Sequence, residues 1–463
     1  MIRLRHAVPA LVLAAGAPLG AQATRTDTAL AYLDTVAAVV GRSHWDTAVV
    51  GASWRALHAS LRDSLRADPS VARTRRAASR LLGALGASHF TILPASDATG
   101  AERGDGTIRA TIRVFWPAAL ITDVPPGSAA FRAGLRPGML LESVRGVPVA
   151  RILAPLEAAP ARQRDTYGPG LLAASLAGEP GSPLRLGLRD VDGRLQEKFI
   201  PCERPEGDTL AMPGMGAQRA RFEAWTLRHD GLVIGAMRFS PWVPQLLARV
   251  DSAMDRLRTA DAIVLDLRGN PGGAALMATG VAGHFVADTL VLAQMRTRTG
   301  QLRYKVNPRR ASTDNRAVTP FAGPLVIVTD AGSASTTELF AGGLQHVKRA
   351  MIVGDTSAGM ALPALVDPLP GGDRLMHAIA DMRLPDGSPF EGRGVVPDLV
   401  VGLDRRRLAQ GQDPEFVVAV AAAAARVRAE RGATPKRGDD LLLGRPPAVT
   451  QPSRSPAPAP SAP

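Results

Sequence analysis

The fold of this chain is decided by two stretches, Leu-Asp-Leu-Arg-Gly-Asn-Pro-Gly-Gly at Leu265–Gly273 and Gly-Ser-Ala-Ser-Thr-Thr-Glu at Gly332–Glu338. Each follows an apolar run, Ala262–Leu265 and Leu325–Thr329, of the kind that forms a buried strand. Each run then breaks into small residues. The second break leads into an expected helix at Thr337–Leu344, so the region alternates strand and helix as an α/β domain does.

The residue types in these two breaks suggest a chemistry. Glycines in the first break let backbone N–H groups approach a substrate closely. The second break places serines at the start of a helix. Backbone donors that face a serine are the minimum equipment for acyl transfer through an oxyanion, so the pattern predicts a serine hydrolase.

Length and composition set the limits for the rest of the chain. The 463 residues predict two or three domains, and 46% of them are hydrophobic, which is enough for sizeable cores. The formal charge of +13 comes almost wholly from arginine. These arginines are scattered and aromatic residues are only 4% of the chain, so we do not expect nucleic-acid binding.

The N-terminal sequence resembles an export signal. Arg3 and Arg5 precede the apolar run Ala10–Leu19, and Ala21-Gln22-Ala23 is a small-x-small cleavage site. The alternative is a short membrane anchor, but the run is shorter than the ~20 apolar residues that a span needs. Cys202 is the only cysteine, so no internal disulfide can form. We therefore expect residues 1–23 to be a signal peptide and the mature protein to be periplasmic or extracellular, with no integral membrane segment.

The remaining chain divides by pattern into five parts. Apolar spacings of three and four predict an N-terminal helical segment, whereas short strands and turns, then alternating strands and helices, predict two further domains. A last helix and a tail rich in Pro, Ala and Ser follow. The expected boundaries are 24–95 for the helical segment, 108–205 for the β-rich domain, 212–410 for the α/β core, 411–437 for the C-terminal helix and 438–463 for the tail.

The β-rich part resembles a PDZ domain. The resemblance is carried by Pro126-Gly127-Ser128-Ala129-Ala130, then Ala133-Gly134-Leu135 and Pro137-Gly138, and it covers roughly ninety residues. It implies a module that adds a peptide as a strand and holds its terminal carboxylate on backbone amides. The expected carboxylate loop departs from this pattern, because it reads Phe-Trp-Pro-Ala-Ala-Leu at 115–120 and Pro117 lacks an N–H. A domain that serves only as a lid or spacer is the alternative.

Three motifs in order carry a second resemblance. Asp266–Gly273, Gly332–Glu338 and Ile352–Gly359 (Ile-Val-Gly-Asp-Thr-Ser-Ala-Gly) are similar to the motifs of the C-terminal processing peptidases, the family that includes the tail-specific proteases and the tricorn core. The resemblance covers nearly the whole mature chain. It implies a multidomain α/β protein in which a crotonase-like β/α serine peptidase core follows the helical segment and the PDZ-like domain.

The family resemblance also implies roles for residues of the two glycine- and serine-rich stretches. The nucleophile is the serine three positions before the motif's glutamate, which is Ser335, with Ser333 as a rival in the same loop. The alternative is that both serines only cap the helix, a position that serine favours. With Ser335 as the nucleophile, the N–H groups of Gly272 and Thr336 would form the oxyanion hole. Glu338 is expected to cap or pair rather than to catalyse.

The base that activates the serine is expected to be a histidine. The tail-specific branch of the family uses a lysine twenty-five residues after the serine, and here that position is Met360, which cannot take a proton. Leu85-Gly86-Ala87-Ser88-His89 instead matches the Leu-x-x-Ser-His context of the tricorn-like branch. That branch also has a glutamate ahead of Gly-Val-x-Pro-Asp, which corresponds to Glu391. The resemblance thus implies His89 as general base, oriented by Glu391 together with Ser88.

The sequence implies neither a metal nor a cofactor, since its histidines lack metal-ligand spacing and Cys202 has no partner cysteine. Our interpretation is an exported serine endopeptidase that cleaves extended or C-terminal polypeptide segments through an acyl-enzyme on Ser335. The alternatives are a non-catalytic peptide- or ligand-binding protein on the same scaffold and an esterase with the same machinery. The sequence leaves the oligomeric state and the side-chain preference open.

Overall fold

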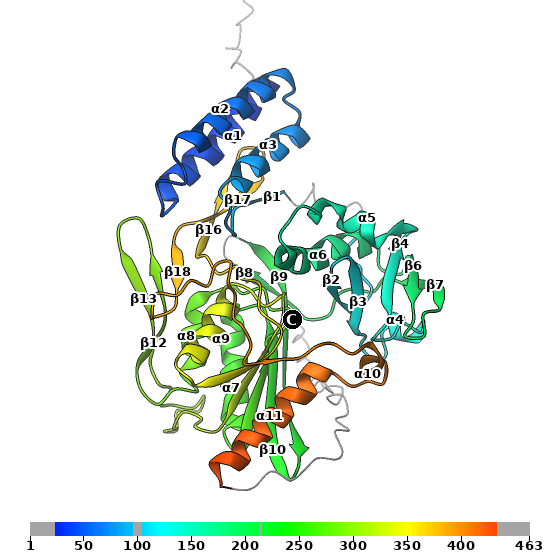
Figure 1. Cartoon of the computed structure of the whole chain (residues 1–463), viewed down its shortest axis with the longest axis vertical. Helices are drawn as coiled ribbons and strands as arrows, with labels where there is room; N and C mark the ends of the chain where they lie inside the picture. Colours follow the sequence, from blue (N-terminus) through cyan, green and yellow to red (C-terminus); the bar gives the residue numbers. More distant parts are fainter. Residues whose placement is uncertain (1–23, 96–103, 213–214, 433–463) are drawn as a thin grey trace, which may run out of the picture.

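A computed structural model describes residues 24–95, 104–212 and 215–432. The expected signal peptide and the expected Pro/Ala-rich tail lie outside these residues. Three regions are visible in Figure 1: helices at the top, a β-rich region at the right and a larger α/β core below. The fold is therefore mixed α/β and contains several sheets. Within the described ranges, no helix has both the length and the apolar character that a membrane span requires.

The N-terminal region consists of three helices that pack on a hairpin of the core. Tyr32, Leu33 and Trp54 lie in one buried cluster with Leu369 and Leu375, which belong to that hairpin. Strand β1 completes a three-stranded sheet with the order β1-β17-β16. The elements are α1 (Arg25–Ser43), α2 (Ala52–Ala67), α3 (Val71–Gly83), β1 (Thr91–Leu93), β16 (Ala364–Pro368) and β17 (Arg374–Ala378).

The strand that follows α3 is short. Only Thr91–Leu93 pair as β1, whereas Ser88 and His89 lie in bends ahead of it. His89 has φ 60°, a backbone conformation that cannot continue a strand.

The β-rich region folds as a six-stranded sheet with helices at its side. The order is β2-β3-β4-β6-β7, with β5 paired to β4, and α6 packs beside the edge strand β2. Gly168 permits this close approach, because a Cβ there would lie 2.8 Å from the Val114 side chain. The elements are β2 (Thr111–Phe115), β3 (Ala118–Asp123), α4 (Ala129–Arg132), β4 (Leu140–Val144), β5 (Val147–Pro148), α5 (Val149–Leu153), η3 (Ala154–Leu156), α6 (Ala161–Leu176), β6 (Pro183–Arg189) and β7 (Leu195–Pro201).

The core is built around a seven-stranded sheet with the order β19-β15-β14-β11-β10-β9-β8. Strands β10, β11, β14, β15 and β19 run parallel, while β9 pairs antiparallel with both of its neighbours, β10 and β8. The predicted strands at Ala262–Leu265 and Leu325–Thr329 are confirmed, and both are fully buried. The strands of this sheet are β8 (Asp208–Met212), β9 (Gly216–His229), β10 (Leu232–Ser240), β11 (Ala262–Asp266), β14 (Leu325–Thr329), β15 (Ala350–Gly354) and β19 (Leu399–Val400).

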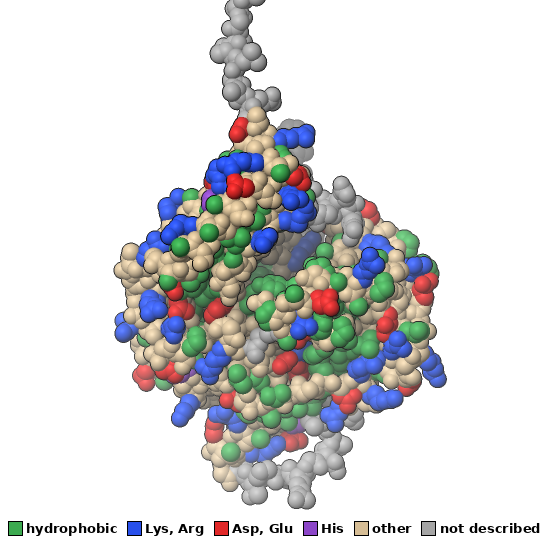
Figure 2. Space-filling model, turned by 45° about the horizontal axis from the view of Figure 1, so that its top comes forward, with side chains coloured by type: hydrophobic (Ala, Val, Ile, Leu, Met, Phe, Trp, Pro, Cys, Tyr) green, Lys and Arg blue, Asp and Glu red, His purple; other side chains and the backbone are tan. Residues whose placement is uncertain are grey.

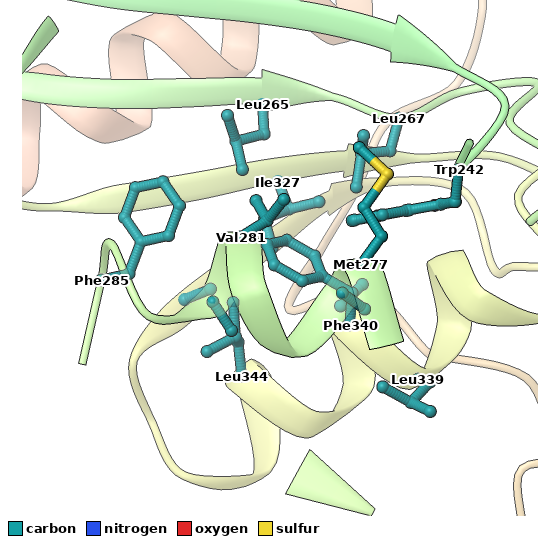
Figure 3. Packing of buried hydrophobic residues seen from close by; sticks show 14 of the residues in the cluster. Trp242, Leu265, Leu267, Met277, Val281, Phe285, Ile327, Leu339, Phe340 and Leu344 are labelled. Carbon is teal, nitrogen blue, oxygen red and sulfur yellow. The ribbon is translucent and has the colours of Figure 1, made fainter. Parts of the chain in front are cut away.

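Helices cover both faces of this sheet. One face packs against α7, α8 and α9 through the cluster in Figure 3, in which Trp242 and Phe340 are completely buried. The other face is covered by α11, whose Val420 and Val427 are buried against the parallel strands. The remaining core elements are η4 (Pro244–Leu246), α7 (Leu247–Leu257), α8 (Ala275–Ala282), β12 (Leu290–Arg296), β13 (Gln301–Val306), α9 (Thr336–His346), β18 (Asp381–Arg383), α10 (Arg405–Ala409) and α11 (Pro414–Glu430).

This sheet determines where a site can form. The segments after β11, β14 and β15 leave the same edge, since parallel neighbours present their carboxyl ends together. Those segments are 267–273, 330–335 and 355–361, and each contains part of one of the three sequence motifs. Motifs separated by up to about ninety residues of chain are thus adjacent at one edge.

Candidate active site

The segments after β11 and β14 are joined by hydrogen bonds. The Ala334 N–H donates to the Asn270 carbonyl at 3.0 Å, and the Thr337 hydroxyl donates to the same oxygen at 2.9 Å. The Thr336 hydroxyl donates to the Gly273 carbonyl at 2.6 Å. These bonds place the glycine-rich segment directly against the serine-bearing loop, as the sequence interpretation requires.

A buried carboxylate held by two arginines anchors the end of β11. Asp266 is 1% exposed and accepts from Arg268 and Arg238. Although burial opposes ionisation, the two guanidinium groups hold the pKa of Asp266 far below its usual range. Its charge therefore stays fixed and the segment after β11 begins from a rigid base.

The two serines of the loop have different surroundings. Ser333 is 0% exposed; its hydroxyl donates to the Leu267 carbonyl at 2.9 Å and accepts from the Asp330 N–H at 3.0 Å. Ser335 is partly exposed and is the N-cap residue of α9. Its backbone has φ 57° and ψ −118°, a conformation that residues with a Cβ rarely adopt. Ser335 is therefore the accessible serine of this loop.

Gly272 lies against this serine. Its φ is 95°, and a Cβ at this position would be only 2.6 Å from the Ser335 Cβ and 2.9 Å from the Thr336 nitrogen. Both the φ and the space require glycine here.

The two amides predicted for the oxyanion hole differ. The Gly272 N–H donates to the Asn270 side chain at 3.1 Å. The Thr336 N–H, in the first turn of α9, has no hydrogen-bond partner among the residues that the structure describes. Neither has the neighbouring Gly273 N–H, which the sequence analysis did not consider. Thr336 therefore offers an available donor, while Gly272 has an internal partner.

A second group of polar residues is joined by hydrogen bonds. It consists of Ser88, His89 and Glu391, and we call it the relay. Glu391 accepts from the Ser88 N–H at 2.7 Å and from the Ser88 hydroxyl at 3.0 Å. The Ser88 hydroxyl lies 2.7 Å from His89 Nδ1. Because the Ser88 proton goes to Glu391, His89 Nδ1 is the donor to Ser88, and its Nε2 is left with the lone pair that a general base needs. Sequence-distant residues 88, 89 and 391 are thus in direct contact.

Within the relay, Ser88 is buried, whereas His89 and Glu391 are half-buried. Burial lowers the pKa of His89 to about 4, so its imidazole is neutral at physiological pH. Burial also raises the pKa of Glu391, while the hydrogen bonds from Ser88 and Ala361 act in the opposite direction.

The segment after β15 connects the serine loop to the relay. The Ser335 N–H donates to the Met360 carbonyl at 2.9 Å. The next residue, Ala361, donates its N–H to Glu391 at 3.2 Å. Among the described residues, no hydrogen bond joins the His89 ring to the Ser335 side chain.

Glu338 has a role that the sequence analysis described only in part. It caps Ser335, since its Oε2 accepts from the Ser335 N–H at 3.0 Å, but no salt bridge was found for it among the described residues. In the sequence, the feature that pointed to a role for Glu338 was its position in the Gly332–Glu338 motif. Lys348, the lysine nearest to Ser335 along the chain, is exposed in a turn after α9.

A search of the described residues found no group of His, Cys, Asp and Glu side chains able to hold a metal ion.

The core of the chain is similar to known peptidases. Residues 234–401 match the family model described as Peptidase family S41. The carboxyl-terminal-processing protease of Synechocystis sp. is 28% identical over 173 residues, which are 37% of this chain and 38% of that protein. The chloroplastic carboxyl-terminal-processing peptidase 2 of Arabidopsis thaliana is 25% identical over 289 residues, or 61% of this chain and 50% of that protein. The chain thus spans about half or less of the length of these relatives.

Two solved structures share the fold. Mature CPAF aligns with a TM-score of 0.61 at 15% identity, covering 88% of this chain and 99% of that one. The photosystem II D1 C-terminal processing protease aligns with a TM-score of 0.54 at 19% identity, covering 83% and 97%. Residues 234–401 therefore carry a peptidase family S41 domain, and the chain is similar to carboxyl-terminal processing proteases.

Proposed function

We propose that this protein is an exported serine endopeptidase that cleaves extended or C-terminal polypeptide segments through an acyl-enzyme on Ser335. One observation carries the proposal. A series of contacts links Ser335 to His89, although the two are far apart in the sequence. It runs from Ser335 through Met360, Ala361, Glu391 and Ser88 to His89. A serine and a neutral, oriented histidine at one site are the requirements for nucleophilic catalysis.

In this mechanism His89 Nε2 removes the proton from the Ser335 hydroxyl as the oxygen attacks the peptide carbonyl. The Ser88 hydroxyl and the Glu391 carboxylate hold the ring in the required tautomer and stabilise the imidazolium. The imidazolium then protonates the leaving amine. A small closure of the site completes the Ser335–His89 contact, since catalytic hydrogen bonds are often long in the resting state.

The developing oxyanion needs donors near Ser335. The Thr336 N–H supplies one, at the N-terminus of α9, where the helix dipole also favours negative charge. The second is the Gly272 N–H, which would have to leave or share its bond to Asn270. This rearrangement accompanies substrate binding in our proposal.

The β-rich region, residues 108–205, is proposed to be the PDZ-like module that presents the peptide. Its Trp116 N–H, in the expected carboxylate loop, donates to the Asp165 carboxylate at 3.2 Å. An internal carboxylate therefore occupies this donor, and Pro117 offers none. A substrate tail can use the loop only after Asp165 moves away.

Space for an extended peptide is visible beside this region. Figure 2 shows a hollow between the N-terminal helices at the top and the β-rich region at the right, with hydrophobic side chains along its wall. An extended chain that crosses this hollow would pass between the regions that supply the relay and the PDZ-like module.

A fluorophosphonate probe tests the proposal. Labelling of the wild-type protein that is lost in Ser335→Ala and retained in Ser333→Ala supports the peptidase. Absence of labelling in folded wild-type protein contradicts it and supports the second candidate, a non-catalytic peptide-binding protein. That candidate is favoured by Met360 in place of a lysine and by the missing Ser335–His89 hydrogen bond.

Two further measurements address the finer parts of the proposal. Turnover of a peptide, compared with an ester of the same acyl group, distinguishes a peptidase from an esterase. Export is tested by N-terminal sequencing of the protein recovered outside the cytoplasm, and cleavage after Ala23 is the expected result.

A further inference from the structure

Glu338 is a buried carboxylate that makes four hydrogen bonds and no ion pair within the described chain. It is 1% exposed. One oxygen accepts from the Ser357 hydroxyl at 2.6 Å and the Gly359 N–H at 2.7 Å. The other accepts from the Ser335 N–H at 3.0 Å and the Met360 N–H at 2.9 Å. All four partners belong to the serine loop or to the segment after β15.

We propose that Glu338 is the positioning residue that sets the register between Ser335 and the histidine relay. Its carboxylate holds the Ser335 backbone and the segment 357–360 as one unit, and this segment leads directly to Glu391. The inference rests on the proposed function, because it describes how the two halves of that site are kept in place.

The segment after β15 is held from two sides. The Gly359 and Met360 amides point to Glu338, whereas the Ala361 amide points to Glu391 at 3.2 Å. Consecutive amides thus bind two carboxylates, one on the nucleophile side and one on the relay side. The spacing between these carboxylates is set by one residue of backbone, so a shift at Glu338 is transmitted to the relay.

The conformation of Ser335 adds a second reason. Its φ of 57° is unfavourable for a residue with a Cβ and persists only where the surroundings hold it. Both the Glu338 carboxylate and the Met360 carbonyl accept from its N–H. Met360 is in turn held by Glu338, so both constraints on Ser335 depend on the same carboxylate.

Direct participation in the chemistry is not part of this role. Both carboxylate oxygens are engaged with protein donors and the side chain is buried, so Glu338 does not touch a substrate. The bonds that connect it to the reaction all run through Ser335 or through 357–360. It acts through other residues.

A charged Glu338 is needed to accept four donors at once. Burial raises its pKa to about 7, against the bonds from Ser357, Met360, Gly359 and Ser335, which lower it. All four direct partners are hydroxyl or amide groups, and the titratable groups joined to the same segment are Glu391 and, through Ser88, His89. Protonation of Glu338 places a hydrogen among four donors, so the arrangement loosens as the pH falls through about 7, well above the pKa of His89 at about 4.

The test compares Glu338→Gln with Asp255→Asn. Asp255 on α7 also accepts from an amide and a hydroxyl, both of Thr313, at 2.8 and 2.7 Å, but has no bond to the segment 357–361. Peptide kcat and KM and the fluorophosphonate labelling rate are measured from pH 5 to 9. We expect Glu338→Gln to lower kcat and the labelling rate by about 10- to 100-fold with KM nearly unchanged, because misplaced reacting groups slow the chemical step. We expect Asp255→Asn to behave as wild type.

The pH profile separates positioning from a general loss of structure. Wild-type kcat should fall as the pH drops through about 7, and the residual activity of Glu338→Gln should lack that fall. A kcat within threefold of wild type in the folded variant, or an unchanged pH profile, overturns the inference. If Glu338→Gln does not fold, Ser357→Ala takes its place in the test, because it removes one of the four hydrogen bonds to Glu338. Wild-type kcat in Ser357→Ala also overturns the inference. Wild-type protein that fails to label refutes the proposed function instead.

Discussion

The serine loop and the histidine relay are two halves of one site that are assembled in different ways. The serine loop comes from the ends of neighbouring parallel strands, β11 and β14, inside one core. The relay joins Ser88 and His89, from the N-terminal helical region, to Glu391 of the core. The first half is a local consequence of the sheet, whereas the second depends on how two regions pack. The difference indicates that the relay is the half more easily disturbed by remote changes.

The backbone supports this comparison. His89 and Ser335 are non-glycine residues with φ near +60°, one in each half. The others with positive φ occupy turns or bends between elements: Arg145, Asp230, Asn315 and Lys348. His89 and Ser335 also lie in a bend and a turn, so the two halves share one backbone feature: each has a Cβ-bearing residue in the sparsely populated positive-φ region.

The largest effect is expected from removing the base. His89→Ala should lower kcat/KM by about 10³- to 10⁶-fold, because an unassisted serine hydroxyl is a poor nucleophile. His58→Ala is the matched control, since His58 lies in the same helical region but pairs with Asp34 at 2.9 Å. Peptide turnover measures both. Near-wild-type activity in His89→Ala would mean that the relay does not belong to the site.

Glu391→Gln should have the next largest effect, about 10²- to 10⁴-fold on kcat, because the amide no longer enforces the His89 tautomer through Ser88. The pKa of Glu391 is raised by burial, so its loss should be most visible above the pH at which it ionises. Pre-steady-state labelling of Ser335 across pH provides the measurement. Glu157→Gln, on the exposed surface of the β-rich region, should change nothing; equal effects of the two would remove Glu391 from the relay.

The packing that brings the relay to the core can be weakened separately. Arg75 on α3 binds Asp373 through two bonds of 2.7 Å, and Tyr32 donates to the same carboxylate at 2.8 Å. Arg75→Ala should reduce the free energy of unfolding by about 1–3 kcal/mol, because it leaves Asp373 buried without its cation. Urea unfolding measures this, with the exposed Arg73→Ala expected within about 0.5 kcal/mol of wild type.

The same pair predicts a pH dependence. Burial opposes ionisation of Asp373, but Arg75, Ala95 and Tyr32 together lower its pKa. A carboxyl with a lowered pKa stabilises the fold above its unfolded pKa of about 3.9, and this stability is lost as the pH falls through the folded value. Wild-type protein should therefore lose more stability in acid than Arg75→Ala. Parallel curves would show that the pair does not anchor the helical region.

The smallest effect is expected in the β-rich region. Asp165→Ala frees the Trp116 N–H and should strengthen binding of a peptide with a free C-terminal carboxylate by up to about tenfold, the value of one hydrogen bond. The affinity for an amidated peptide should not increase. Fluorescence anisotropy measures both, with Asp192→Ala on the exposed β6–β7 turn as control. Equal binding before and after the change would favour a spacer role for this region.

The sequence predicted the elements that build the serine half of the candidate site. Apolar runs predicted the buried strands β11 and β14, and small residues after them predicted a loop in which glycine faces serine. This worked because strand, loop and helix follow directly along the chain, so local patterning describes them. The likeness to known peptidases then pointed to Ser335, His89, Ser88 and Glu391 before any contact between them was known.

Only the tertiary structure decided how these residues meet. Ser333 and Ser335 are the same residue type in one loop, yet Ser333 is completely buried and Ser335 is partly exposed. The sequence predicted that Glu338 caps the helix or forms an ion pair. In the structure it also accepts hydrogen bonds from Ser357, Gly359 and Met360, which lie about twenty residues further along the chain. The physical reason is the same in both cases. Burial and hydrogen-bond partners are set by the packing of segments that the chain order does not place side by side.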